Sequence, residues 1–201
     1  MSPQAFIFVG RAGSGKGTQA RLLIRALEKL DSDHPVIYIE TGAEFRKFNE
    51  GPSYTAKLGK STIDKGIYMP EFMPIYIWGN LLVSKYSGKE NLVFDGTPRK
   101  LIEAQVLESL FPFYGLGKPW VIYLDIEHGE SIKRLTLRTV AQGRKDDTPE
   151  GMENRRKEYE KNVVPIIGWY RAHSNVNFLD IDGERSIEEI HADIVKRVGL
   201  A

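Results

Sequence analysis

Short apolar runs alternate along the chain with longer stretches in which apolar residues recur every three or four positions. The short runs have the length and composition of buried strands, and they cover residues 5–9, 35–39, 91–94, 119–125 and 176–181. Residues 20–30 carry the first clear helical pattern. Apolar strands that alternate with helices predict an α/β fold in which a doubly wound, five-stranded parallel sheet has helices on both faces.

Further helices are predicted from the same spacing and from capping signals. They cover residues 42–50, 53–66, 70–86, a stretch from Arg99 to about 111, a stretch after the fourth strand through Arg134, 148–173, and 185–198. Proline lacks an amide hydrogen and clashes with the preceding turn. The long helix over 148–173 should therefore be disturbed at Pro165.

The composition is that of one globular domain spanning residues 1–201. The net charge is only +1, so no overall field favours nucleic acid or a membrane surface. Cysteine is absent, which excludes disulfides and thiolate metal sites and suits a reducing compartment. The start of the chain lacks a basic flank, and no apolar run approaches the roughly 20 residues of a membrane span. These features predict neither a signal peptide nor a membrane-spanning segment.

A glycine-rich stretch, Gly10 to Gln19, lies between the first strand and the first helix. Its Gly-x4-Gly-Lys spacing, in a strand–turn–helix context, is typical of a phosphate-binding loop (P-loop). Glycines let successive amides face one anion, the helix N-terminus adds partial positive charge, and Lys16 would reach the outer phosphates. The alternative is a tight turn that binds nothing. Gly17 stands where the general pattern has a magnesium-binding Ser or Thr, so Thr18 and carboxylates elsewhere would have to serve the metal.

Several polar or glycine residues follow the ends of the other predicted strands. These are Thr41, Asp95, Asp125 and Gly183. In a parallel sheet the carboxyl ends of the strands share one edge, where ligands bind. Asp95 is placed there to hold magnesium directly or through water, although an aspartate before Gly96 could equally cap a turn.

Arginines form the second group of candidates, because the guanidinium fork matches two phosphate oxygens. The candidates are Arg46, Arg99, Arg134, Arg138, Arg144 and Arg155. Arg134 and Arg138 lie four apart and share a helix face, where like charges repel unless an anion lies between them. Arg156, Arg171 and Arg185 are assigned to the solvated surface.

Together these motifs resemble the adenylate kinase family over essentially the whole chain. The matching segments are the loop from Gly10 to Gln19, Thr41-Gly42 with Arg46, the Asp95-Gly96-Thr97-Pro98-Arg99 signature, and a lid with Arg134, Arg138, Gly143-Arg144 and Arg155. The resemblance implies a helical monophosphate-binding insertion over 41–70 and a short lid over 137–147. The short lid lacks the zinc-bearing insertion of some relatives.

The resemblance also implies residue roles. ATP would contact Gly13, Ser14, Gly15, Lys16, Gly17, Thr18, Arg134, Arg138 and the backbone at Gly183. AMP would contact Thr41, Gly42, Arg46, residues 67–69 including Tyr68 and Met69, Gly96, Arg99, Glu103, Arg144 and Arg155. The catalytic charges would be Lys16, Arg99, Arg138, Arg144 and Arg155. Magnesium would lie near Thr18 and Asp95, and no zinc is expected. Members of the family usually act as cytoplasmic monomers, so the resemblance implies a cytoplasmic monomer here.

Two departures from the family pattern concern the acceptor. Thr97 replaces an aromatic residue, and Glu103 replaces the glutamine that reads adenine. A carboxylate only accepts hydrogen bonds, whereas an amide also donates, so a kinase for another base, such as GMP, CMP or UMP, is an alternative. A nucleotide-binding switch with slow ATPase activity is a further hypothesis. A panel of monophosphate acceptors distinguishes all three.

Overall fold

The structure, a computed structural model, describes residues 2–142 and 148–200. Within them one sheet contains β1 (Ala5–Gly10), β2 (Val36–Glu40), β3 (Asn91–Asp95), β4 (Trp120–Asp125) and β5 (Asn177–Asp182). All neighbouring strands are parallel and the order is β2-β3-β1-β4-β5. This arrangement confirms the predicted five-stranded, doubly wound sheet.

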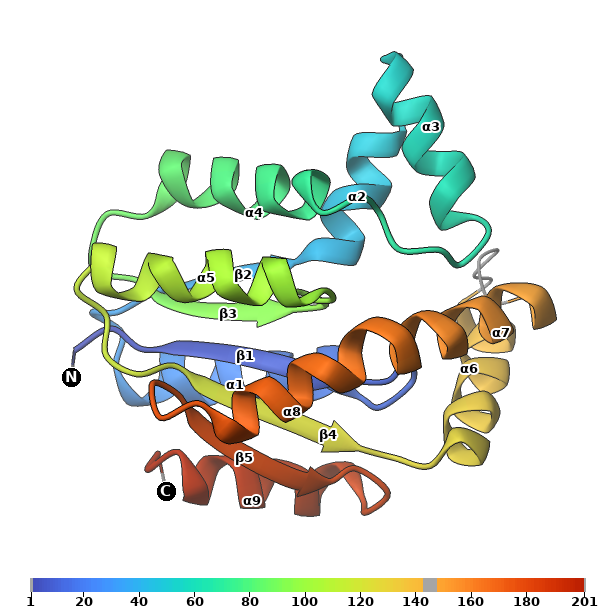
Figure 1. The fold of residues 1–201 in the computed structure, drawn as a ribbon. Coiled ribbons are helices and arrows are strands. Elements are labelled where there is room, and N and C mark those ends of the chain that lie inside the picture. The colour runs from blue at the N-terminus through green and yellow to red at the C-terminus, as the bar shows by residue number, and fades with distance from the viewer. Residues whose placement is uncertain (1, 143–147, 201) are drawn as a thin grey trace.

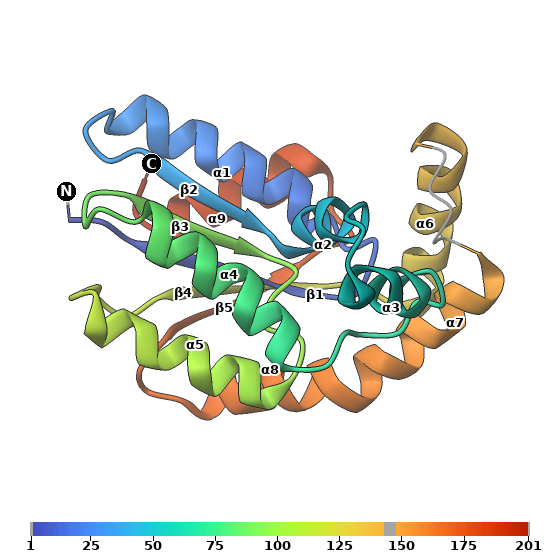
Figure 2. The same ribbon diagram turned by 90° about the horizontal axis from the view of Figure 1, so that it is seen from above.

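Helices cover both faces of the sheet (Figure 2). One face packs against α1 (Lys16–Leu30) and α9 (Ile187–Arg197), and the other against α4 (Phe72–Lys85), α5 (Leu101–Phe113) and α8 (Val164–Ala172). Alternate residues of β1 serve the two sides: Phe6 and Phe8 join the α1–α9 cluster, while Ile7 joins the other. A central strand buried on both faces must be apolar throughout, which is why this run shows no polar alternation.

Two helical units project beyond the carboxyl ends of the strands (Figure 1). One comprises α2 (Thr41–Asn49) and α3 (Tyr54–Ile63), and the other α6 (His128–Gln142) and α7 (Pro149–Glu158). The units meet where the Asn154 side-chain amide donates to the carbonyl of Lys65 at 2.8 Å. Beside this bond the backbones of Gly66 and Gly151 approach so closely that a Cβ at residue 66 would collide with the Gly151 carbonyl.

The long helix predicted over 148–173 is interrupted earlier than expected. A π-helical turn, η1 (Tyr159–Val163), separates α7 from α8, and Pro165 lies in the first turn of α8. Proline cannot donate to the preceding turn and needs room there, so the widened turn precedes it. The helix predicted to end at Arg134 continues to Gln142, so the first part of the proposed lid is helical. In the described part of the chain, no helix has the length and apolarity needed to cross a membrane.

Candidate functional site

The glycine-rich loop turns sharply between β1 and α1. Gly13 and Gly15 have φ angles of +78° and +92°, in the left-handed region that favours glycine. Gly10 is required by a close approach, because a Cβ there would lie 2.6 Å from the carbonyl oxygen of Leu124. Helix α1 begins at Lys16, so its N-terminal amides and their partial positive charge face the loop. The loop has the form of an anion cradle.

Lys16 is held by the same loop. Its Nζ donates to the carbonyl oxygens of Gly10 and Arg11 at 2.8 and 2.6 Å. Desolvation, opposed by the charge of Asp95 and aided by the charges of Arg99 and Arg138, lowers the pKa of Lys16 to about 8. These two hydrogen bonds of Lys16 are to neutral carbonyls, so an incoming phosphate would supply an anionic partner.

One pocket of about 880 Å³ lies between this loop and the two projecting units. Most of the residues predicted from the sequence line it. They are Gly13, Ser14, Gly15, Lys16, Gly17, Thr18, Thr41, Gly42, Arg46, Tyr68, Met69, Asp95, Gly96, Arg99, Glu103, Arg134, Arg138 and Arg155. Arg144 lies outside the described residues, and so does the rest of the predicted lid from 143 to 147. Five separate arginines therefore converge on the space beside the glycine loop.

The side of the pocket opposite the glycine loop, its far wall, includes Thr41 and Arg99. Within residues 2–142 and 148–200, one of these polar side chains lacks a hydrogen-bond partner and the other has one. Thr41 is buried, and its hydroxyl has no hydrogen-bond partner among the described residues. Arg99 is already oriented, because its Nε donates to the Gly96 carbonyl at 2.8 Å and its guanidinium lies 4.7 Å from the ring centre of Tyr68. A buried hydroxyl without a partner is costly, so a ligand oxygen would satisfy Thr41.

Glu103 has a role in the fold that the sequence did not reveal. Its Oε2 accepts hydrogen bonds from the Arg99 amide at 2.9 Å and from the Thr97 hydroxyl at 3.2 Å. Burial raises the pKa of the Glu103 carboxyl, although these two donors and the charges of Arg99 and Lys100 oppose the shift. The two departures from the family pattern, at 97 and 103, are therefore joined by a hydrogen bond, and only part of the carboxyl faces the pocket.

Asp95 ends β3 and lines the pocket beside the glycine loop. A Cβ added at Gly17 would lie 3.0 Å from Asp95 Oδ2 and 3.4 Å from the guanidinium of Arg21. A serine or threonine at position 17 would therefore fit only if the side chain of Asp95 moved slightly. Within the described residues, no group of three or more His, Cys, Asp or Glu side chains could hold a metal. Magnesium fits this donor set only when phosphates and water supply most of its ligands, which is its usual mode of binding.

Gly183 does not line the pocket, although the residues after it do. Its amide donates to the Asp125 carbonyl at 2.7 Å, and a Cβ there would lie 2.8 Å from Ile126. Close packing of β4 and β5 accounts for this glycine. The chain then continues into Arg185, Ser186 and Ile187, all of which line the pocket.

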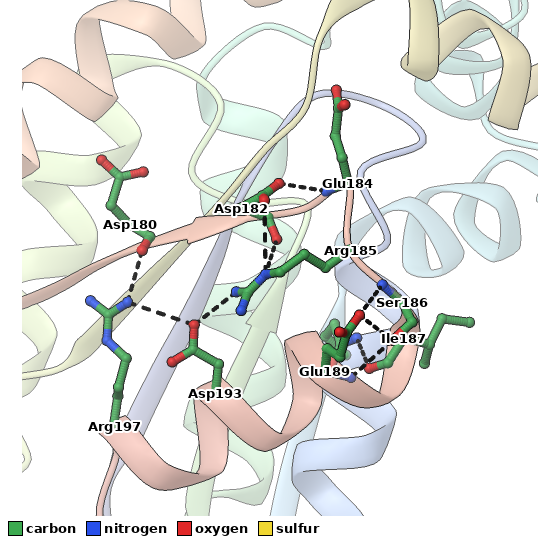
Figure 3. Close-up of polar contacts among 10 residues, drawn as sticks. Asp180, Asp182, Glu184, Arg185, Ser186, Ile187, Glu189, Asp193 and Arg197 are labelled. Atoms are coloured by element: carbon green, nitrogen blue, oxygen red, sulfur yellow. Dashed lines mark hydrogen bonds and ion pairs between the residues drawn. The ribbon is translucent and has the colours of Figure 1, made fainter.

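The side chain of Arg185 is 34% exposed, in keeping with its assignment to the surface, and it also lines the pocket. Figure 3 shows it between Asp182 and Asp193, and its Nη2 donates to Asp193 at 2.8 Å. Gln19 was missed: it is buried, lines the pocket, and donates from Nε2 to the Ile187 carbonyl at 2.9 Å. Its position in the first turn of α1, next to the glycine loop, could have indicated that it lies near the pocket. Its hydrogen-bond partner is 168 residues away, so that contact could not be predicted from the sequence.

Comparison with known proteins gives a consistent result. A family model described as adenylate kinase matches residues 8–175. Among curated proteins, the adenylate kinase of Phocaeicola vulgatus is 31% identical over 192 residues, and that of Parabacteroides distasonis is 30% identical over 192 residues. Each alignment covers 96% of this chain and 96% of the relative. The adenylate kinase of Thermosynechococcus vestitus is 30% identical over 197 residues, with the same coverage.

Proposed function

The chain belongs to the adenylate kinase family, and on that premise we propose that its single large pocket binds ATP at the glycine loop and AMP at the opposite wall. The protein is a nucleoside monophosphate kinase. It transfers the γ-phosphoryl group of ATP to AMP, reversibly, to give two ADP. The observation that carries the assignment of the site is that Lys16 and the arginines of the far wall line one pocket.

The proposed chemistry needs no protein nucleophile. A phosphate oxygen of AMP attacks the γ-phosphorus of ATP, the bond to the β,γ-bridging oxygen breaks, and ADP leaves with that electron pair. Catalysis is then positioning and neutralisation of charge on the moving group. Lys16, Arg99, Arg138 and Arg155 would supply the positive charge, and Arg144 would join them. Support comes from the pocket lining, in which all of these except Arg144 are described.

On the donor side, the ATP phosphates would lie on residues 13–18, with Arg134 and Arg138 above them. The base would lie toward residues 185–187, which extend the predicted contact at Gly183. This proposal is supported by the pocket lining and by the bond from Gln19 to Ile187, which ties the two ends of the donor site together.

On the acceptor side, Thr41, Gly42, Arg46 and the 67–69 segment would hold AMP together with Gly96 and Arg99. The hydroxyl of Thr41, buried without a partner among the described residues, supports a phosphate or sugar oxygen beside it. Glu103 would meet the base through the part of its carboxyl that is not bonded to its own loop. Arg46 already donates to Glu40 at 3.1 Å. Because this carboxylate neutralises part of its charge, Arg46 would attract the AMP phosphate less strongly than Arg99.

Magnesium would be held by Asp95 through water, with Thr18 nearby and the nucleotide phosphates as its main ligands. When bound, the ion would neutralise negative charge on the phosphates. The protein's own task is to orient the nucleotide and exclude water. We propose that the segments 41–70 and 137–147 close over the substrates for this purpose; the contact between the Gly66 turn and α7 supports it.

The enzyme is further proposed to act as a monomer in the cytoplasm, without nucleic acid or membrane partners. The near-neutral net charge and the absence of cysteine support this assignment.

An acceptor panel tests the proposed function directly. Purified protein is given ATP and magnesium with AMP, GMP, CMP or UMP, and both products are quantified by ion-exchange chromatography. We expect ADP in a two-to-one ratio to the AMP consumed, with AMP the best acceptor. ATP consumption that is the same with and without any monophosphate would contradict the proposal and indicate a simple ATPase.

A further inference from the structure

Asp95 is approached from the neighbouring strand by a tyrosine that the proposed function does not use. The Tyr38 hydroxyl donates to Asp95 Oδ2 at 3.0 Å. Tyr38 lies in the middle of β2, and β2 pairs with β3 so that Tyr38 is opposite Val93 and Glu40 is opposite Asp95. Paired residues of parallel strands point to the same face of the sheet. The phenol ring therefore reaches along this face to the carboxylate at the strand end.

Asp95 is held at its Oδ2 atom. Oδ2 accepts the hydrogen bond from Tyr38, and a Cβ at Gly17 would lie 3.0 Å from it, so the carboxylate lies against the glycine loop. From this contact we infer that Tyr38 is a positioning residue, whose hydroxyl holds the Asp95 carboxylate beside the loop, where the magnesium–nucleotide complex would bind. The inference rests on the proposed function.

The phenol is well suited to a permanent donor role. Its hydroxyl carries the proton that Asp95 Oδ2 accepts, and the distance between the two oxygens is 3.0 Å. A fixed donor matters here because the described residues offer no further cluster of carboxylates or imidazoles for a metal.

This reading also gives a reason for the glycine at position 17. In a loop with serine or threonine there, the hydroxyl would be the loop's own metal ligand. Here Gly17 leaves room for Asp95 to approach the loop, and Tyr38 fixes the approach. The side chain proposed to bind the metal is therefore Asp95 at the end of β3, and Tyr38 on β2 supports it.

The test compares nucleotide binding with and without metal. Dissociation constants for a non-transferable ATP analogue are measured by calorimetry, once in magnesium and once in EDTA, for the unaltered protein and for Tyr38→Phe. The readout is the ratio of the two constants, EDTA over magnesium. We expect Tyr38→Phe to lower this ratio about 2- to 10-fold, the range for one hydrogen bond, and to leave the constant in EDTA unchanged.

A matched control is Tyr123→Phe. Tyr123 donates to Asp125 at 2.6 Å at the end of β4, which β1 separates from β3, but neither residue lines the large pocket. The ratio of the dissociation constants, EDTA over magnesium, should be the same for Tyr123→Phe as for the unaltered protein. A second control closes a thermodynamic cycle: if Tyr38 acts through Asp95, the substitution Tyr38→Phe should have no further effect on the ratio in the Asp95→Asn background.

The inference is overturned if Tyr38→Phe keeps the unaltered ratio, if both constants change by the same factor, or if metal does not strengthen binding to the unaltered protein. Phosphotransfer by the unaltered protein is assayed in the same preparation. Lost transfer with the expected ratios would refute the proposed function and leave the role of Tyr38 standing. Normal transfer with an unaffected Tyr38→Phe ratio would refute only the role of Tyr38.

Discussion

The two walls of the pocket are built differently. The glycine loop is anchored between β1 and α1, whose residues Phe8 and Leu23 are essentially inaccessible in the core beneath it. The acceptor wall at α2 and the 67–69 segment rests on a small separate cluster of Phe45, Met69 and Met73. The glycine loop packs on the main core and is therefore fixed before substrate binds. The wall at α2 and 67–69 packs on a small apolar cluster, so it opens at a lower cost in free energy.

Their polar groups differ in the same way. Lys16 already donates to two carbonyls of its own loop, but the Thr41 hydroxyl has no partner among the described residues. The proposed donor site is therefore preorganised, whereas on the proposed acceptor side Arg99 is already oriented and Thr41 would gain its partner from the ligand. This difference predicts that substitutions at the glycine loop reduce turnover itself, and that substitutions at the acceptor wall act more on the KM for AMP.

The largest effect is expected from Lys16→Met, which keeps the length of the side chain and removes its charge. Loss of one preorganised donor to a developing charge typically lowers turnover about 100- to 1000-fold. We expect that loss in kcat, measured by a coupled assay, with an unchanged unfolding transition in circular dichroism. Turnover close to that of the unaltered protein would contradict the preorganised donor site.

Arg99→Ala should have the next largest effect. It removes a guanidinium aimed into the pocket and the contact with Tyr68, at a cost of about 10- to 100-fold in kcat/KM for AMP. The KM for ATP should change much less. Arg156→Ala is the matched control, because its ion pairs with Glu153 and Glu160 lie on the helix surface and such pairs contribute little. Equal effects of both substitutions would remove the distinction between the two walls.

The pH dependence of ATP binding sharpens the comparison further. The pKa of Lys16 in the free protein is about 8, so the lysine is charged below that pH and loses its proton above it. ATP needs the charged form, so its affinity should be constant from pH 6 to about 8 and then fall by up to about tenfold per unit. Analogue binding measured across this range should be flat in Lys16→Met. A decline of the same steepness in that variant would assign the pH effect to another group.

The smallest effect is expected at the base end of the acceptor wall. Thr97→Val removes the hydroxyl that donates to Glu103 and keeps the shape of the side chain. One lost hydrogen bond predicts a KM for AMP raised about 2- to 10-fold, with the KM for ATP unchanged. Thr97→Ser retains the hydroxyl and should behave as the unaltered protein. The idea that Thr97 orients Glu103 fails if valine and serine give the same KM.

Local patterns in the sequence were sufficient for the sheet and for the glycine loop, because both depend on neighbours in the chain. Apolar runs give strands, and the spacing from Gly10 to Lys16 gives the turn. The interruption near Pro165 was predicted one turn too late, since the π-helical turn at 159–163 accommodates the proline from the preceding residues. The position of Arg185 in the pocket wall could not be predicted, because a single charged residue carries no local sign of the surface it will face.

Periodicity and turn chemistry are local, so the α/β architecture, the phosphate loop and the charged residues at the strand ends could be predicted from the amino-acid order alone. Which groups meet depends on the folded chain. Tyr38 reaches Asp95 across 57 residues, and Gln19 reaches Ile187 across 168. These contacts follow from strand register and helix packing. Both are set by how the whole chain buries its apolar surface, which no short stretch encodes.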